Sequence, residues 1–132
     1  MLILFGTMCL PWLSTGCTKD QDQADTGYRA AAITFRQDSG YTYLNDTFPA
    51  GDTVRIGVTV DQGTEHLVTF RVDRKYDNGP VVHMDTVPIP AVPFHHDAIY
   101  VLRNQPGVEQ WSFIAVESNG DLTKRSLTFT TQ

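Results

Sequence analysis

Thr53-Val54-Arg55-Ile56-Gly57-Val58-Thr59-Val60 is the stretch of sequence that decides the fold. Aliphatic residues occupy every second position, and Thr, Arg and Gly occupy the positions between them. Because successive side chains of a β-strand point to opposite faces of its sheet, this period of two predicts one buried face and one solvated face. Such strands are typical of antiparallel sandwiches. The residues expected in the core are Val54, Ile56, Val58 and Val60.

Further strands are expected on both sides of this segment, because similar extended runs return between turn signals. They cover Ala31–Arg36, Leu67–Asp73, Val81–Val87, Asp97–Arg103, Glu109–Glu117 and Arg125–Thr131, and Tyr41–Phe48 is expected to be extended with an edge strand. The residues expected on the apolar faces are Ile33, Phe35, Val68, Phe70, Val72, Ile99, Val101, Trp111, Phe113, Ala115, Leu127 and Phe129. The sequence therefore predicts an all-β protein, an immunoglobulin-like antiparallel β-sandwich of about seven strands.

Two turn-rich segments connect these strands. Tyr76–Pro80 is expected to form a hairpin turn in which Asn78-Gly79 adopts positive φ at low cost. Pro88–Pro93 is rich in proline, which has no backbone N–H to donate and cannot sit in a central strand. We expect this second segment to be an extended connection that crosses to the other sheet.

Length and charge limit the classes of function. The chain of 132 residues has room for one domain of ordinary size. Its formal net charge of -5 makes nucleic acid and anionic membrane surfaces unexpected as electrostatic partners.

The stretch MLILFGTMCLPWLSTGC, from Met1 to Cys17, is an apolar run that breaks at Pro11. The run Leu2–Leu13 is too short for a spanning helix, which needs about 20 residues, and suits the hydrophobic region of a signal peptide. The stretch resembles a bacterial lipoprotein signal peptide with its lipobox. The resemblance implies that Cys17 is lipidated and that the preceding segment, with Cys9, is removed. The mature chain would then hold no disulfide.

Residues 18–27, TKDQDQADTG, are polar and without periodicity, and we expect a flexible tether there. The expected organisation is a lipoprotein signal peptide over 1–16, a tether over 17–28 and a sandwich domain over 29–132. The implied location is the bacterial outer membrane, with the lipid on Cys17 as the membrane contact and the domain facing the periplasm or the cell surface.

The end of the chain carries a further resemblance. Trp111–Gly120 and Lys124–Phe129 are similar to the final hairpin of bacterial Ig-like and PKD-like domains, in which an aromatic residue begins an alternating strand, an acidic-polar-Gly turn follows and a Ser/Thr-rich strand closes the chain. Upstream, Ile33-Thr34-Phe35 and Gly51–Val58 resemble small Ig-like lipoproteins of Gram-negative bacteria. This implies a cell-surface module but supplies no catalytic residues, and fold alone does not assign function.

The most ligand-like cluster is His95-His96-Asp97, which His66 and His83 could join. Neighbouring residues of a strand point to opposite sides, so both histidines of the pair rarely bind one metal. No serine lies in a Gly-x-Ser-x-Gly motif. We expect no metal, no cofactor and no catalysis.

Two binding functions stay open. A third and less favoured hypothesis is an enzyme, which would need a convergent polar cluster in a concave pocket. The first is a non-catalytic module for protein interaction or structural display. The second is a glycan-binding accessory lipoprotein, because tyrosines near loops can stack on sugar rings. The candidate ligand contacts are Tyr76, Asn78, His95 and His96.

Overall fold

The computed structural model describes residues 27–132, so the predictions for the signal peptide, Cys17 and most of the tether lie outside the described residues. The described chain contains eight strands. They are β1 (Ala32–Phe35), β2 (Asp46–Phe48), β3 (Thr53–Asp61), β4 (Leu67–Tyr76), β5 (Val81–Pro88), β6 (Phe94–Val101), β7 (Gly107–Glu117) and β8 (Leu122–Thr131). The strand beyond the expected seven is β2, the short edge strand anticipated within Tyr41–Phe48.

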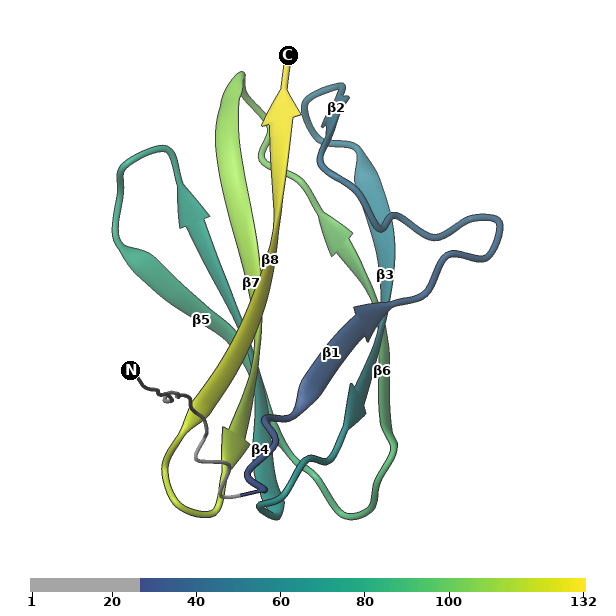
Figure 1. Ribbon diagram of the computed structural model, residues 1–132. Helices are drawn as coiled ribbons and strands as arrows, with labels where there is room; N and C mark the ends of the chain where they lie inside the picture. The colour runs from purple at the N-terminus through teal and green to yellow at the C-terminus, as the bar shows by residue number, and fades with distance from the viewer. Residues whose placement is uncertain (1–26) are drawn as a thin grey trace, which may run out of the picture.

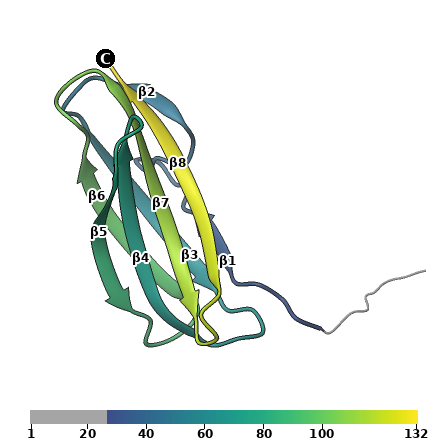
Figure 2. The same cartoon turned by 90° about the vertical axis from the view of Figure 1, so that its left-hand side faces the viewer.

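The strands form two sheets that pack face to face (Figures 1 and 2). The smaller sheet has the order β1-β3-β6, and the larger sheet has the order β2-β8-β7-β4-β5. Neighbouring strands are antiparallel except β2 and β8, which run parallel. The predicted all-β sandwich is confirmed, with this parallel pair as an addition that the sequence pattern did not indicate.

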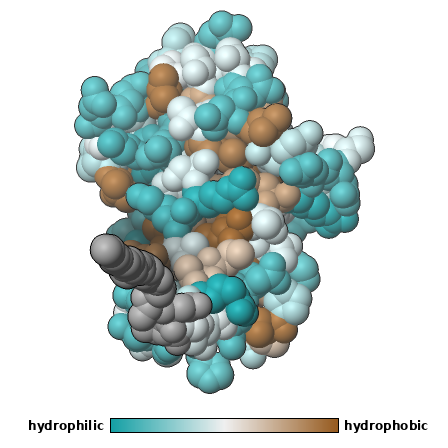
Figure 3. All heavy atoms as spheres, viewed as in Figure 1, coloured by the Kyte–Doolittle hydropathy of each residue, from teal (hydrophilic) through white to brown (hydrophobic). Residues whose placement is uncertain are grey.

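The core lies between the sheets and is built from the predicted alternating positions. Ile56 and Val60 of β3 are completely buried, as are Phe70, Phe113 and Phe129 from the larger sheet. Burying an aliphatic or aromatic side chain of this size contributes about 1.5–3 kcal/mol, so these positions account for much of the stability of the fold. On the outside, hydrophobic residues appear as separate small patches on the face shown in Figure 3.

The prediction for the start of β4 was wrong. Val68 was expected inside, but it is 48% exposed, and Leu67 takes the buried position. The pairing of β4 with β7 shifts register between Leu67 and Thr69. A bulge of this kind adds one residue to a strand, which reverses the faces of the residues before it.

The prediction for β6 was also wrong in two respects. The strand begins at Phe94, so it includes both histidines, and its apolar residues Ile99 and Val101 are 67% and 63% exposed. The inward positions are held by His96 and Tyr100, whose rings lie 4.9 Å from Phe70 and 4.4 Å from Trp111. Ring stacking against the larger sheet thus sets which face of β6 is buried.

The turn between β4 and β5 forms where expected but with different backbone geometry. Asp77 has positive φ, at 48°, in place of Asn78-Gly79. Aspartate tolerates the left-handed conformation better than most residues do. Here the side chain is also fixed by a long-range contact, because Asp77 Oδ1 accepts a hydrogen bond from the N–H of Val108 at 2.9 Å. The expected crossing of Pro88–Pro93 to the other sheet is confirmed, because this segment joins β5 to β6.

Candidate functional site

The structure separates the four residues predicted to contact a ligand into two pairs. Tyr76 ends β4 and Asn78 lies in the turn that follows it. His95 and His96 lie near the start of β6, at the opposite end of the sandwich (Figure 1). These residues do not form one site. Cys17, the predicted lipidation site, lies outside the described residues.

Tyr76 is held by arginines. The guanidinium carbons of Arg74 and Arg103 lie 4.1 Å and 4.6 Å from the centre of its ring. Arg103 Nη1 also donates to Asp77 Oδ2 at 2.8 Å. The pKa of Asp77 lies below its usual value because the backbone N–H of Val108 and the Arg103 guanidinium stabilise the carboxylate. These contacts join the turn after β4 to the segment between β6 and β7, so Tyr76 has a structural role.

The two adjacent histidines face opposite sides of the smaller sheet. His95 faces outward, and its Nδ1 lies 3.0 Å from Thr59 Oγ1. His96 faces inward, and burial lowers its pKa. Its Nε2 lies 3.8 Å from Asp85 Oδ2 of β5. Within residues 27–132, no three His, Cys, Asp or Glu side chains gather closely enough to hold a metal ion.

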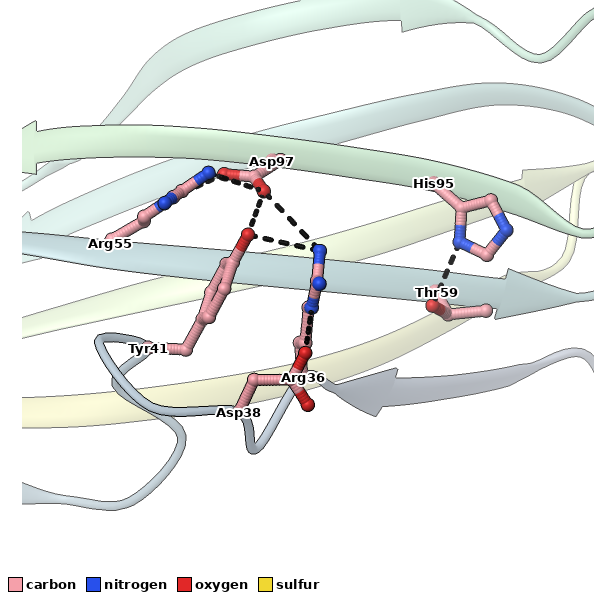
Figure 4. Close-up of polar contacts among 7 residues, drawn as sticks. All are labelled: Arg36, Asp38, Tyr41, Arg55, Thr59, His95 and Asp97. Atoms are coloured by element: carbon pink, nitrogen blue, oxygen red, sulfur yellow. Dashed lines mark hydrogen bonds and ion pairs between the residues drawn. The ribbon is translucent and has the colours of Figure 1, made fainter.

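A tyrosine clamp lies on the outer face of the smaller sheet (Figure 4). We define it as Tyr41 with Arg36, Arg55 and Asp97. The ring of Tyr41 lies between the two guanidinium groups, whose carbons are 4.6 Å and 4.5 Å from the ring centre. Gly57 lies beneath the ring, where a Cβ would stand 3.0 Å from Tyr41 Cε1 and 2.9 Å from Arg36 Cβ. Only glycine lets the edge of the tyrosine ring come so close to β3.

The polar groups of the clamp satisfy one another. The Tyr41 hydroxyl donates to Asp97, and Arg36 Nη1 donates to the same hydroxyl at 3.0 Å. Arg55 Nε donates to Asp97 Oδ1 at 3.0 Å. The Arg55 and Tyr41 hydrogen bonds lower the pKa of Asp97, while the bond to Asp97 raises the pKa of Tyr41. The clamp therefore fixes the segment between β1 and β2, and its bonding capacity is largely used.

Tyr100 is engaged in the core. Its ring packs against Trp111, and desolvation by burial raises its pKa to about 12. Tyr43 also packs against the core cluster. With Tyr41 and Tyr76 stacked by arginines, these four rings are engaged within the protein, which leaves less ring surface for stacking on sugars.

The outer face of the larger sheet carries a groove of about 470 Å³ (this face is toward the viewer in Figure 2). It is lined by residues of β4, β5, β7 and β8, with Leu122 and Lys124 coming from β8: Arg71, Asp73, Arg74, Lys75, Val81, Gln110, Ser112, Ile114, Leu122 and Lys124. Its floor is well packed, since Ile114 is 4% and Ser112 is 8% exposed although both point away from the core. A packed floor beneath an open volume is the geometry of a binding groove.

Cross-strand register explains how the groove forms. Ile114 of β7 lies opposite Arg71 of β4 on one side and Lys124 of β8 on the other. The aliphatic stems of such long side chains can cover an apolar neighbour while the charged ends reach solvent. Ile114 is thereby shielded without a covering element, and the charged ends form the rim of the groove.

A polar row of four residues, His83, Asp73, Ser112 and Ser126, runs across the strands, and its two central members, Asp73 and Ser112, line the groove. In register, Asp73 lies between His83 of β5 and Ser112 of β7, and Ser112 pairs with Ser126 of β8. His83 Nδ1 lies 2.7 Å from Asp73 Oδ1, and Arg71 Nε lies 3.3 Å from the same oxygen. The two serine hydroxyl oxygens lie 2.9 Å apart. The row can donate and accept hydrogen bonds to a ligand, and its carboxylate is compensated by Arg71.

Sequence reasoning missed this groove. One signal was present: Ile114 is apolar but has the opposite parity from Trp111, Phe113 and Ala115, which places an isoleucine on the solvent side. A single residue of that kind does not indicate which other strands lie beside it. The groove becomes visible only when the pairing of β4, β7 and β8 is known.

Comparisons with known proteins add information on the fold. Neither a protein-family model nor a curated protein matches this chain. Among solved structures, the chain is similar to the sensor domain of the anti-sigma factor RsgI4 from Pseudobacteroides cellulosolvens, with a TM-score of 0.51 and 12% identity over 78% of this chain and 95% of that chain. A chain of the CaDoc0917–CaCohA2 complex aligns at a TM-score of 0.38 and 14% identity, over 78% of this chain and 100% of that chain. The first likeness supports a β-sandwich domain.

Within residues 27–132 there is no helix with the length and hydropathy that crossing a membrane requires.

Proposed function

We propose that this protein is a non-catalytic Ig-like binding module, held at the bacterial outer membrane by a lipid on Cys17, and that it contacts its ligand through the groove of the larger sheet. The observation that carries the proposal is the groove floor. Ile114 and Ser112 are buried on the side of the sheet that no other part of the described chain covers. A face that is formed and open in this way is suited to an external partner.

The order of the polar row supports binding in preference to hydrolysis. Nucleophilic catalysis by serine needs a base within hydrogen-bond reach of the hydroxyl. Here Asp73 stands between His83 and Ser112 in the register, and the imidazole is bonded to that carboxylate. The Ser112 hydroxyl is paired with Ser126 instead. The row therefore resembles a recognition surface more than a catalytic group.

The lipid anchor is tested by fractionation of the full chain expressed in a Gram-negative host. We expect the wild-type protein in the outer-membrane fraction, with the mass of an acylated Cys17 at its N-terminus, and Cys17→Ala in the soluble fraction. A wild-type protein that keeps Met1, or a Cys17→Ala variant that stays with the membrane, would contradict the anchor.

The groove is tested by a fragment screen followed by NMR. Small fragments are titrated into the isotope-labelled protein, and we expect amide shifts to gather at Asp73, Ser112 and Ile114. Ser112→Trp, which fills the groove, should abolish these shifts, and Thr53→Trp on the smaller sheet should not. Hits that gather instead around Tyr76 and Asn78, or around His95, would place the binding surface elsewhere.

A further inference from the structure

We infer that the groove takes an acidic oligosaccharide, a chain of hydroxyl-rich rings that carries carboxylates or sulfates on separate units. This deepens the proposed function and rests on it. Three features of the groove lead to the inference: its charge, the spacing of that charge around an apolar floor, and the kind of hydrogen-bonding group that it offers.

The charge of the groove is opposite to that of the protein. Four lining residues are basic and one is acidic, in a chain with a formal net charge of -5. Lys75 and Lys124 are the lysines of the range 27–132, and both line the groove. Within that range, neither has a carboxylate at ion-pair distance, whereas Arg71 is paired with Asp73 at 3.3 Å. Two ammonium groups are thus available to an anionic ligand, and opposite charge favours its approach.

The positive charges are spread around the floor. Lys75 and Arg71 are four residues apart on β4, which is about 13 Å along a strand. Lys124 lies two strands from β4, which is about 10 Å across a sheet. Ile114 and Ser112 lie on β7 between these positions. A ligand that meets both lysines must carry separated negative charges and must lie over an isoleucine and a hydroxyl.

The available hydrogen-bonding groups favour a saccharide over an acidic peptide. β4 and β7 each pair with strands on both sides, so their backbone groups are used within the sheet. An extended peptide laid on this face would find no backbone partners for its own amides, and unpaired polar groups are costly. The face offers side-chain hydroxyl and amide groups, from Ser112 and Gln110, which suit the hydroxyls of a sugar.

The test measures affinity by calorimetry at low salt with three probes. Tetragalacturonate is the acidic saccharide, its methyl ester is the neutral saccharide with the same skeleton, and tetraglutamate is an acidic peptide of the same length. We expect tetragalacturonate to bind at least about tenfold more tightly than either of the others, since a hydrogen bond to a charged group is stronger than one between neutral groups. High salt should weaken this binding.

Variants assign the effect to the groove. Lys75→Ala and Lys124→Ala should each weaken tetragalacturonate binding about tenfold. Arg29→Ala is the matched control, because it removes one positive charge from an exposed position outside the groove, and it should bind as the wild type does. Circular dichroism confirms that each variant is folded.

The outcomes distinguish the inference from the proposed function. Equal binding of the ester, or tighter binding of tetraglutamate, with loss in Ser112→Trp, would overturn the acidic saccharide and leave the groove as the binding surface. No binding of any probe, together with no fragment shifts at Ser112 and Ile114, would overturn both. Tetragalacturonate binding that Lys75→Ala and Lys124→Ala leave unchanged would overturn the inference.

Discussion

The two outer faces of the sandwich use polar residues in opposite ways. On the smaller sheet, the tyrosine clamp joins two arginines, one aspartate and one tyrosine in contacts that satisfy each other (Figure 4). On the larger sheet, Lys75 and Lys124 surround a packed floor without a carboxylate partner among residues 27–132. Both faces are polar and exposed. They differ in how much of their bonding capacity the protein itself uses.

This difference shows that a cluster of chemically versatile side chains is weak evidence for a site. Tyr41 and Asp97 have shifted pKa values, yet their partners are each other and the two arginines. The groove instead retains free donors, the ammonium groups of Lys75 and Lys124, over a packed floor. The predictions that follow test this contrast, from the largest expected effect to the smallest.

The contacts of the clamp should be lost when a side chain on β3 displaces the ring of Tyr41. Gly57→Val puts a branched side chain where a Cβ alone would lie 3.0 Å from the ring, and we expect a loss of about 1–3 kcal/mol in the free energy of unfolding. Denaturant melts measure it. Thr53→Val, an exposed position on the same strand, is the control and should change stability by less than about 0.5 kcal/mol. Equal stability of the two variants would mean that the clamp contributes nothing.

A milder change tests the hydrogen bonding of the clamp. Tyr41→Phe keeps the ring between the guanidiniums but removes the hydroxyl that donates to Asp97. The pKa of Asp97 should rise toward its ordinary value, because one of the bonds that stabilises its carboxylate is lost. NMR titration of the carboxyl carbon measures this, with Tyr43→Phe as the control. An Asp97 pKa that stays in place would show that Arg55 alone sets it.

His96, which lies between the sheets and on neither outer face, should make the stability of the fold depend on pH. Burial lowers the pKa of His96 in the folded state, despite the nearby Asp85 and Asp97, so the unfolded chain binds the proton more readily. Stability should be complete above the unfolded pKa of about 6.5 and should fall as the pH drops below it. Melts between neutral and mildly acidic pH measure this. His96→Gln should remove this dependence and His95→Gln should keep it; the reverse would contradict the account.

The smallest effect on stability is expected in the groove. Lys75→Ala and Lys124→Met should each change the free energy of unfolding by less than about 0.5 kcal/mol, because neither ammonium has a partner within the described chain and methionine keeps an apolar stem beside Ile114. Denaturant melts provide the check. A loss as large as that of Gly57→Val would assign the lysines to the fold and would erase the difference between the faces.

The sequence supported a good prediction of the fold, but it did not indicate the groove that we propose as the site. Regular alternation placed β3 and β7 correctly, since a period of two fixes both the strand and its buried face. It failed for Val68, where a bulge changes the parity, and for Ile99, where the rings of His96 and Tyr100 hold the inward positions. These failures share a cause. Where apolar residues occur on both faces of a strand, the face that is buried depends on which partners its side chains contact.

The proposed site was harder to predict because its residues come from several separate segments of the chain. Lys75 and Lys124 are far apart in sequence and meet around Ile114 only through the pairing of β4, β7 and β8. The residues that the sequence favoured, Tyr76 and His96, are conspicuous in type but engaged in structural contacts. Chemical versatility can be read from a sequence, whereas freedom to bind depends on the neighbours of each group.

A crystal structure of the protein with tetragalacturonate tests the central claim most directly. We predict the saccharide over Ile114 and Ser112 on the larger sheet, with its carboxylates at the ammonium groups of Lys75 and Lys124 and with the tyrosine clamp unchanged. A saccharide bound on the smaller sheet at Tyr41 and Asp97, with the groove empty, would contradict the account.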